Sequence, residues 1–161
     1  MSKRRPRSRL RPRSKRRIQH DLTAPAGTLR STLGGELTRV SFMGLTPGPA
    51  SEARDVDVDA AKAAASRGPL WLDVNGLATV ATLESLRDRF GFAPLAMEDV
   101  VHLHQRPKSE VYEQHLFIVL RMPQLVDGQL ELEQLSMFLA PNLVATFQER
   151  PGDCFEPIRE R

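Results

Sequence analysis

Three apolar segments near the end of the sequence, joined by two very short connections, constrain the fold more than any other feature. The connections contain Asp127-Gly128 and Pro141-Asn142, pairs that are typical of hairpin turns. Consecutive strands joined by so few residues pair antiparallel. The sequence therefore predicts a C-terminal antiparallel meander. Its strands are expected at residues 111–123, 130–140 and 143–148.

Two further strands are expected upstream of the meander. Residues 37–43 alternate apolar and polar side chains, as a strand with one buried face does. Residues 70–74 form a compact apolar run that ends at the Asn75-Gly76 turn, a pair that commonly terminates a strand. Together with the meander, these strands favour a mixed sheet.

Helical patterns separate these strands. Asp59 is expected to cap one helix and Thr79 the next, which ends at Gly91, because Asp and Thr are favoured N-caps and Gly is a favoured C-cap. A third, shorter helix is expected from Pro94 to about Leu103. Strands and helices in this order predict an α/β (α+β) domain, with a mixed β-sheet flanked by helices. The three helices are expected at 60–67, 80–90 and 94–103.

Charge is distributed unevenly along the 161 residues. Residues 1–17 contain ten of the 23 Lys and Arg residues and no Asp or Glu. The remaining 13 basic residues stand against 20 acidic ones, so residues 18–161 carry a formal net charge of −7. Few apolar residues and repelling like charges predict that residues 1–27 form a disordered basic tail. The acidic remainder is suited to binding cations.

Three roles remain open for the basic tail. It is a solvated extension, an attachment to anionic lipid headgroups, or a non-specific contact with nucleic acid. No aromatic side chain lies among its arginines, so base stacking is not supported. We expect no specific recognition of nucleic acid.

Several classes of protein are excluded by what the sequence contains. Cys154 is the only cysteine, which excludes an internal disulfide and a cysteine-based zinc site and fits a reducing cytosol. The longest apolar run, residues 116–120, is far below the roughly 20 residues that a membrane helix needs. No glycine-rich phosphate loop and no grouping of nucleophile, base and orienting residue is present. We therefore do not expect an enzyme.

The expected helix from Pro94 carries the candidate binding residues. Residues three and four apart are neighbours on a helix, so Glu98, Asp99 and His102 gather on one side. Two carboxylates and an imidazole on an exposed face attract a divalent cation, although a plain solvated polar face explains the same spacing. Mg²⁺ takes six oxygen ligands, so a tight site needs acids from another element or another subunit. The opposite, apolar face consists of Met97, Val100 and Val101.

A set of motifs in a fixed order carries a family resemblance. Its most informative members are the runs 95–100, which contains Glu98-Asp99, 104–110 and 112–120. Further members are 71–76, 135–139, 143–149 and 152–161. In their order and spacing these motifs resemble the cytosolic domain of the CorA family of magnesium/cobalt channels. The resemblance runs from about Pro69 to Arg161, is weaker from Gly27 to that point, and does not include the basic tail.

The resemblance implies membrane transport of Mg²⁺ and Co²⁺ by a pentameric channel of the bacterial inner membrane. It implies a cytosolic α/β domain at residues 28–154 and the start of a stalk helix at 155–161. The family's Gly-Met-Asn pore motif and both membrane helices are absent from the sequence. We therefore expect a regulatory domain that is truncated before the pore, and a chain that by itself is soluble and cytoplasmic.

The resemblance also implies a regulatory metal site between neighbouring domains. Glu98 and Asp99 match the acidic pair on one side of that site, and an acid on the neighbour's stalk helix supplies the other. We expect weak, regulatory binding of Mg²⁺ or Co²⁺ and no catalytic residue; no family role is implied for His102 or His104. The alternative is a free-standing binding protein that uses residues 1–17 for nucleic acid or anionic lipid.

Overall fold

One mixed sheet forms the centre of the computed structural model, which describes residues 25–30, 35–45, 52–126 and 128–159. The expected tail lies almost entirely outside the described residues. Within these ranges the strands are β1 (Arg39–Gly44), β2 (Glu52–Ala53), β3 (Leu70–Asn75), β4 (Lys108–Val111), β5 (Leu116–Val126), β6 (Gln129–Ala140) and β7 (Leu143–Gln148).

The strand order is β2-β1-β3-β7-β6-β5-β4. β3 and β7 run parallel, and all the other neighbouring strands of the described sheet run antiparallel. The prediction of a mixed sheet with a C-terminal antiparallel meander is therefore confirmed. The meander has four strands, β4 to β7, rather than the three expected.

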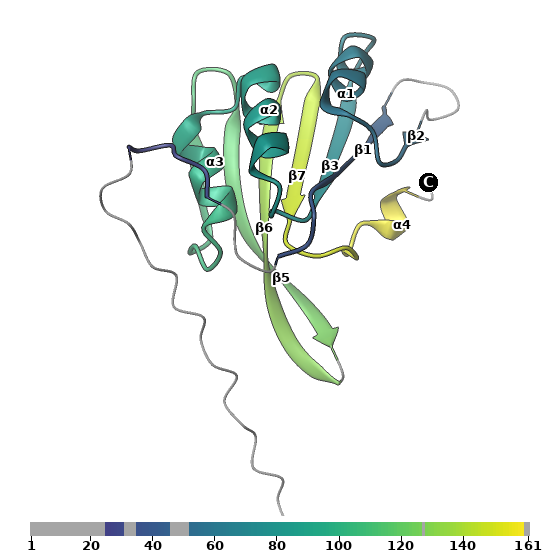
Figure 1. The fold of residues 1–161 in the computed structure, drawn as a ribbon. Coiled ribbons are helices and arrows are strands. Elements are labelled where there is room, and N and C mark those ends of the chain that lie inside the picture. Colours follow the sequence, from purple (N-terminus) through teal and green to yellow (C-terminus); the bar gives the residue numbers. More distant parts are fainter. Residues whose placement is uncertain (1–24, 31–34, 46–51, 127, 160–161) are drawn as a thin grey trace, which may run out of the picture.

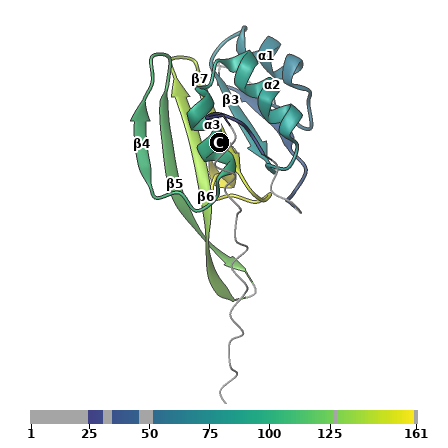
Figure 2. The same cartoon turned by 60° about the vertical axis from the view of Figure 1, so that its left-hand side comes forward.

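Helices cover one face of the sheet and leave the other largely uncovered (Figures 1 and 2). The covering helices are α1 (Val58–Ala65), α2 (Val80–Phe90) and α3 (Pro94–Val101). A short helix, α4 (Glu156–Arg159), lies against the opposite face. Arg159 of α4 lies over the Trp71 ring. Trp71 alternates along β3 with Leu70 and Leu72, which point into the helix-covered core, so its ring and α4 lie on the other face.

An aromatic cluster fills the core between the helices and the meander. Phe138 is fully buried, and its ring centroid lies 4.2 Å from that of Phe92 and 4.9 Å from that of Phe117. Phe147 completes the group at 5.6 Å from Phe138. Fully burying one such ring stabilises the fold by roughly 1.5–3 kcal/mol, so these four side chains fix the meander against the helices.

Two local expectations were wrong. The strand expected at 111–123 begins only at Leu116, as β5, and Val111 instead ends the separate strand β4. Between them, the exposed residues Glu113 and Gln114 form a tight turn in which the Tyr112 N–H donates to the His115 carbonyl at 2.9 Å. The expected N-cap Asp59 was also wrong. Asp57 caps α1 by accepting from the Ala60 N–H at 2.6 Å.

His115 is a buried titratable group within the aromatic cluster. It is 8% exposed, and its Nε2 atom has no hydrogen-bond partner among the described residues. Its ring lies 5.0 Å from Phe138 and 5.1 Å from Tyr112. Burial lowers the pKa of His115, because a charged imidazolium here is cut off from water.

This pKa shift predicts a loss of stability in mild acid. The unfolded chain takes up a proton on this histidine below about pH 6.5, whereas the folded chain does so only at lower pH. The free energy of unfolding therefore falls as pH decreases from 6.5, by at most about 1.4 kcal/mol per pH unit, and His115 has no effect above that pH. Urea unfolding at pH 7.5 and 5.5 measures the loss.

The matched control is His115→Phe, which keeps an aromatic ring but cannot be protonated. Other titrating groups, such as Glu133, are common to both proteins and cancel in the comparison. The variant should lose less stability than the parent between the two pH values. Equal losses in parent and variant would contradict the prediction.

Candidate metal centre

Helix α3 places the candidate carboxylates at the rim of the core. Pro94 occupies its first turn, where the missing N–H costs nothing. As predicted, Met97, Val100 and Val101 are buried, at 0%, 1% and 3% exposure. Glu98 and Asp99 follow on the other side but are only 29% and 21% exposed at their side chains. They are therefore half-buried acceptors rather than members of a fully solvated face.

Glu98 binds the segment that precedes the sheet. Its Oε2 atom accepts a hydrogen bond from the Gly27 N–H at 2.8 Å, and its Oε1 atom lies 3.7 Å from His102 Nδ1. Gly27 has a φ of +84°, and a side chain there would place its Cβ 2.7 Å from the Pro94 Cβ. This close approach requires a glycine and brings the backbone amide to the carboxylate.

Asp99 is held by two side chains from the turn and strand that follow α3. Its Oδ1 atom accepts from Gln105 Nε2 at 2.7 Å, and its Oδ2 atom accepts from Lys108 Nζ at 2.6 Å. Lys108 also donates to Glu110 Oε1 at 2.8 Å. The ammonium group therefore lies between two carboxylates, one from α3 and one from β4.

The lysine and its partners shift each other's protonation. Burial acts to lower the pKa of Lys108, but its hydrogen bonds to Asp99 and Glu110 raise that pKa above the ordinary lysine value. The hydrogen bond from Lys108, with a second from the Tyr112 hydroxyl, lowers the pKa of Glu110. Lys108 thus stays charged at neutral pH and partly neutralises the charges of Asp99 and Glu110.

A buried glutamine sets the position of the C-terminal end of α3. Gln134, on β6, is 3% exposed. Its Nε2 atom donates to the Asp99 carbonyl at 2.9 Å, and its Oε1 atom accepts from the Gln105 N–H at 2.9 Å. This satisfies backbone groups that the end of a helix leaves open. The orientation of Asp99 therefore depends on the meander.

The sequence missed Gln105, Lys108 and Gln134 as parts of this centre. Helical spacing relates only residues on α3, and these three reach Asp99 through a chain reversal and a distant strand. The position of Lys108 within the 104–110 run was a usable signal, since a cation shortly after a Glu-Asp pair can fold back on it.

The local donor set can supply one side of a metal site. In the part of the chain that the structure describes, no three His, Cys, Asp or Glu side chains lie together in a way that could hold a metal ion. Each carboxylate retains lone pairs, since an ionised carboxylate accepts up to about four hydrogen bonds. Carboxylate oxygens suit Mg²⁺, which usually keeps several waters. Glu98 and Asp99 are chemically suited to such an ion, but the ammonium group of Lys108 already binds Asp99.

His102 and His104 lie in different surroundings, one beside the acidic pair and the other in the turn after α3. His102 is beside Glu98 at the end of α3, with its side chain 25% exposed. His104 is exposed and has a φ of +82° in the turn that follows. The structure therefore brings only His102 near the acidic pair.

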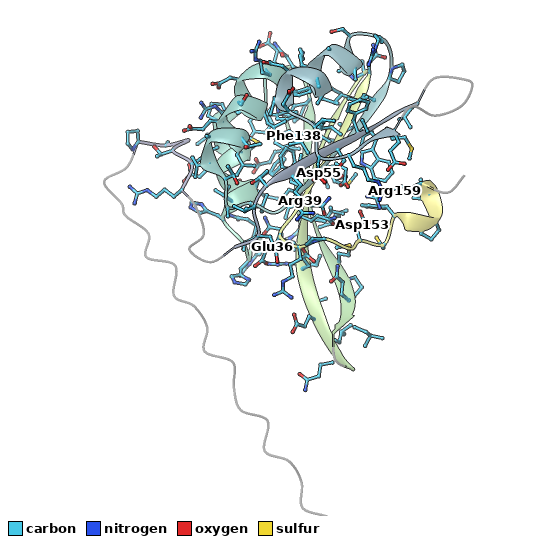
Figure 3. The ribbon with its side chains drawn as sticks, turned by 45° about the vertical axis from the view of Figure 1, so that its right-hand side comes forward. Glu36, Arg39, Asp55, Phe138, Asp153 and Arg159 are labelled. Carbon is cyan, nitrogen blue, oxygen red and sulfur yellow. The ribbon has the colours of Figure 1, made fainter. Side chains whose placement is uncertain are left out.

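The other acidic run, Asp55, Asp57 and Asp59, has structural partners. Asp57 caps α1, and Asp59 lies 2.7 Å from Arg89 on α2. Asp55 lies 3.9 Å from Arg39. Figure 3 shows Asp55 and Arg39 close together. This run positions α1 rather than forming a second centre.

Known proteins resemble this chain in sequence. A protein-family model described as "CorA-like Mg2+ transporter protein" matches residues 66–161. The cobalt/magnesium transport protein CorA of Thermotoga maritima is 41% identical over 98 residues, which make up 60% of this chain and 28% of that protein. The chain thus matches less than a third of the length of this relative.

Two solved structures resemble it in fold. The soluble domain of CorA from Methanocaldococcus jannaschii has a TM-score of 0.51 and 15% identity, and the match covers 75% of this chain and 43% of that one. The full-length CmaX protein has a TM-score of 0.58 and 18% identity, over 80% of this chain and 40% of that one. No helix among the described residues is long and apolar enough to cross a membrane.

The family model covers more than half of the 161 residues, including α3 with Glu98 and Asp99 and all four strands of the meander. The fold agrees, with a helix-covered mixed sheet like those of the matched structures. This chain therefore belongs to the family of CorA-like Mg²⁺ transporter proteins.

Proposed function

We propose that this chain is the regulatory, metal-sensing module of a CorA-type magnesium and cobalt transporter, placed at the cytoplasmic face of the membrane. The observation that carries the proposal is the half-buried pair Glu98–Asp99 on α3, inside the region matched by the family model. The relative from Thermotoga maritima is named for cobalt and magnesium transport. Ion conduction then belongs to parts of the intact transporter outside the matched region.

In this proposal Mg²⁺ or Co²⁺ binds weakly between neighbouring copies of the chain. Glu98 and Asp99 offer oxygen ligands from one copy, and acids of the next copy complete the set. A cation that keeps several waters needs only one or two carboxylates from each side. The assembly would be a homo-oligomer, a pentamer in the family that the sequence resembles.

Regulation follows from charge. A bridging cation offsets the repulsion between carboxylates of adjacent copies and favours the closed assembly, whereas its loss restores the repulsion. A ligand shifts such an equilibrium only by its differential affinity for the two states. Five sites of about 1 kcal/mol each, at the low end of ordinary coupling energies, sum to a decisive shift.

Lys108 is the built-in competitor of the metal. Its ammonium group lies 2.6 Å from Asp99 Oδ2, so a cation that binds Asp99 directly has to displace it or share the carboxylate. The side chains of Lys108 and Asp99 are 28% and 21% exposed, and such partly solvated pairs contribute little free energy. Competition from Lys108 therefore lowers the affinity for the metal only modestly. Weak binding and ready release are expected because one chain supplies only two carboxylates to a cation that takes six oxygen ligands.

Titration of the full chain with Mg²⁺, followed by NMR, tests the proposed site. Amide shifts should move across 95–102 in the parent. Asp99→Asn should weaken binding by at least about tenfold, because a neutral amide replaces one of the two carboxylates that can bind Mg²⁺ directly or through its waters. Lys108→Met should tighten Mg²⁺ binding by up to about fivefold, because the metal then no longer competes with an ion pair that is worth at most about 1 kcal/mol.

Two control variants remove the same charges elsewhere. Asp88→Asn removes an exposed acid on α2, and Lys62→Met removes a lysine on α1; both should titrate like the parent. The proposed site is wrong if the parent shows no shifts across α3, or if Asp99→Asn binds Mg²⁺ as tightly as the parent.

A second candidate function rests on the ten basic residues among the first 17. These residues lie outside the described part of the chain. They suit anionic surfaces, since each Lys or Arg near such a membrane contributes about 1 kcal/mol. On this proposal the chain is a free-standing binding protein whose folded part is a scaffold.

Deletion of residues 1–17 distinguishes the two functions. The shortened chain should lose binding to vesicles of phosphatidylserine and phosphatidylcholine and to duplex DNA, while its Mg²⁺-dependent shifts stay unchanged. Co-sedimentation with vesicles and a gel-shift assay measure the first effect. Vesicle and DNA binding that survives the deletion would eliminate the tail as the binding element.

A further inference from the structure

The face of the sheet opposite α1 to α3 carries a second charged cluster, built around Arg159 of α4. The two terminal nitrogens of Arg159 donate to both oxygens of Asp153, one of them at 2.8 Å. Nη2 also donates to Asp73 Oδ2 on β3 at 3.1 Å. Figure 3 shows Arg159 and Asp153 next to each other at α4. The guanidinium group thus joins α4 to the loop before it and to the sheet.

Trp71 forms the platform on which this cluster rests. The guanidinium carbon of Arg159 lies 4.7 Å from the centre of the Trp71 ring, within the range of a cation–π interaction. Phe155 meets the same ring edge-on at 5.6 Å. The indole N–H donates to Thr146 Oγ1 at 3.0 Å, and that hydroxyl donates to Asp73 at 2.9 Å. Trp71 is thereby fixed to both β3 and β7.

The charges in this cluster depend on one another because they are largely removed from water. The side chains of Arg159, Asp73 and Asp153 are 15%, 13% and 2% exposed. Burial raises the pKa of Asp73, and the hydrogen bond from Thr146 and the charge of Arg159 only partly oppose this. Burial acts in the same direction on Asp153, but hydrogen bonds from Arg159 and the Phe155 N–H bring its pKa below the ordinary value.

The segment between β7 and α4 has the features of a hinge. Gly152 is exposed and has a φ of +94°, and a Cβ there would meet nothing within 4 Å. Its carbonyl accepts one hydrogen bond, from Gln124 Nε2 at 2.8 Å. Helix α4 has four residues, too few to be stable by itself, and Ile158 on it is 57% exposed. The helix is therefore held by side-chain contacts rather than by its own backbone.

We infer that Arg159 is a latch that fixes α4 on Trp71, with Gly152 as the hinge about which the helix swings when the latch opens. The closed latch sets the direction in which residues 156–159 leave the sheet. The open latch exposes Trp71 and frees Asp73 and Asp153. This device is independent of metal binding at Glu98 and Asp99, which lie on the helix-covered side.

The chain carries its own reporter for the latch, because Trp71 is its only tryptophan. In the full chain, Arg159→Gln should shift Trp71 emission to longer wavelength and increase its quenching by acrylamide. Backbone order parameters at Ile158 and Arg159 should fall from roughly 0.85 to below about 0.6, while those of β3 and β7 stay rigid. Arg159→Lys should give an intermediate result, because an ammonium group keeps the charge but loses the planar fork.

Two further variants complete the test. Arg150→Gln removes a cation from the same loop, one that pairs with Glu131 on β6 instead, and should behave like the parent. Asp73→Asn should lower the backbone order parameters of α4 while those of β3 stay unchanged. The latch is refuted if Arg159→Gln leaves Trp71 fluorescence and α4 order unchanged. It is equally refuted if β3 and β7 lose order together with α4, since α4 then has no motion of its own.

Discussion

The parallel pairing of β3 with β7 is the interaction on which the rest of the structure depends. It places Leu72 beside Ala145 and Val74 beside Phe147, which joins the N-terminal strands to the meander. Parallel neighbours cannot be joined by a hairpin, so α2, α3 and three strands of the meander are contained in the crossover between them. Asp99 lies in that crossover and Asp73 on the seam itself.

The two charged clusters follow from this pairing. Asp99 owes its position to α3, inside the crossover, and to Gln134 on β6, which holds the end of that helix. Asp73 owes its position to the seam, where Thr146 of β7 reaches it across the parallel pair. The cluster around Asp99 lies on the helix-covered side of the sheet, and the cluster around Asp73 lies on the open face. The two groups of charges are therefore on opposite sides of the sheet that this strand pairing completes.

Local patterns in the sequence predicted what neighbouring residues decide among themselves. The spacing of Met97, Val100 and Val101 predicted the buried face of α3, and hairpin residues predicted the antiparallel meander. The spacing did not predict that the Gly27 N–H would donate a hydrogen bond to Glu98, or that Lys108 would donate one to Asp99. Those contacts depend on chain reversals whose geometry is set by tertiary packing. The helical period of 3.6 residues and the strand period of 2 residues carry no information about such packing.

Short and exposed elements were the hardest to predict. β4 has four residues with alternating partial exposure, so no apolar run marks it, and only its last residue, Val111, fell within a predicted strand. β2 has two residues and was missed for the same reason. Arg159 was likewise unremarkable in sequence, because its importance comes from Trp71 and Asp73, more than 80 residues away along the chain.

The chemistry of the two cations explains why the proposed metal is placed at α3 and not on the open face. Lys108 is a flexible point charge shared between Asp99 and Glu110, and a hydrated divalent cation competes with it on similar terms. Arg159 presents a planar fork to Asp153 and stacks on Trp71. Removing one partner from such a buried pair costs several kcal/mol, so this second pair of carboxylates is closed to metal for as long as α4 stays docked.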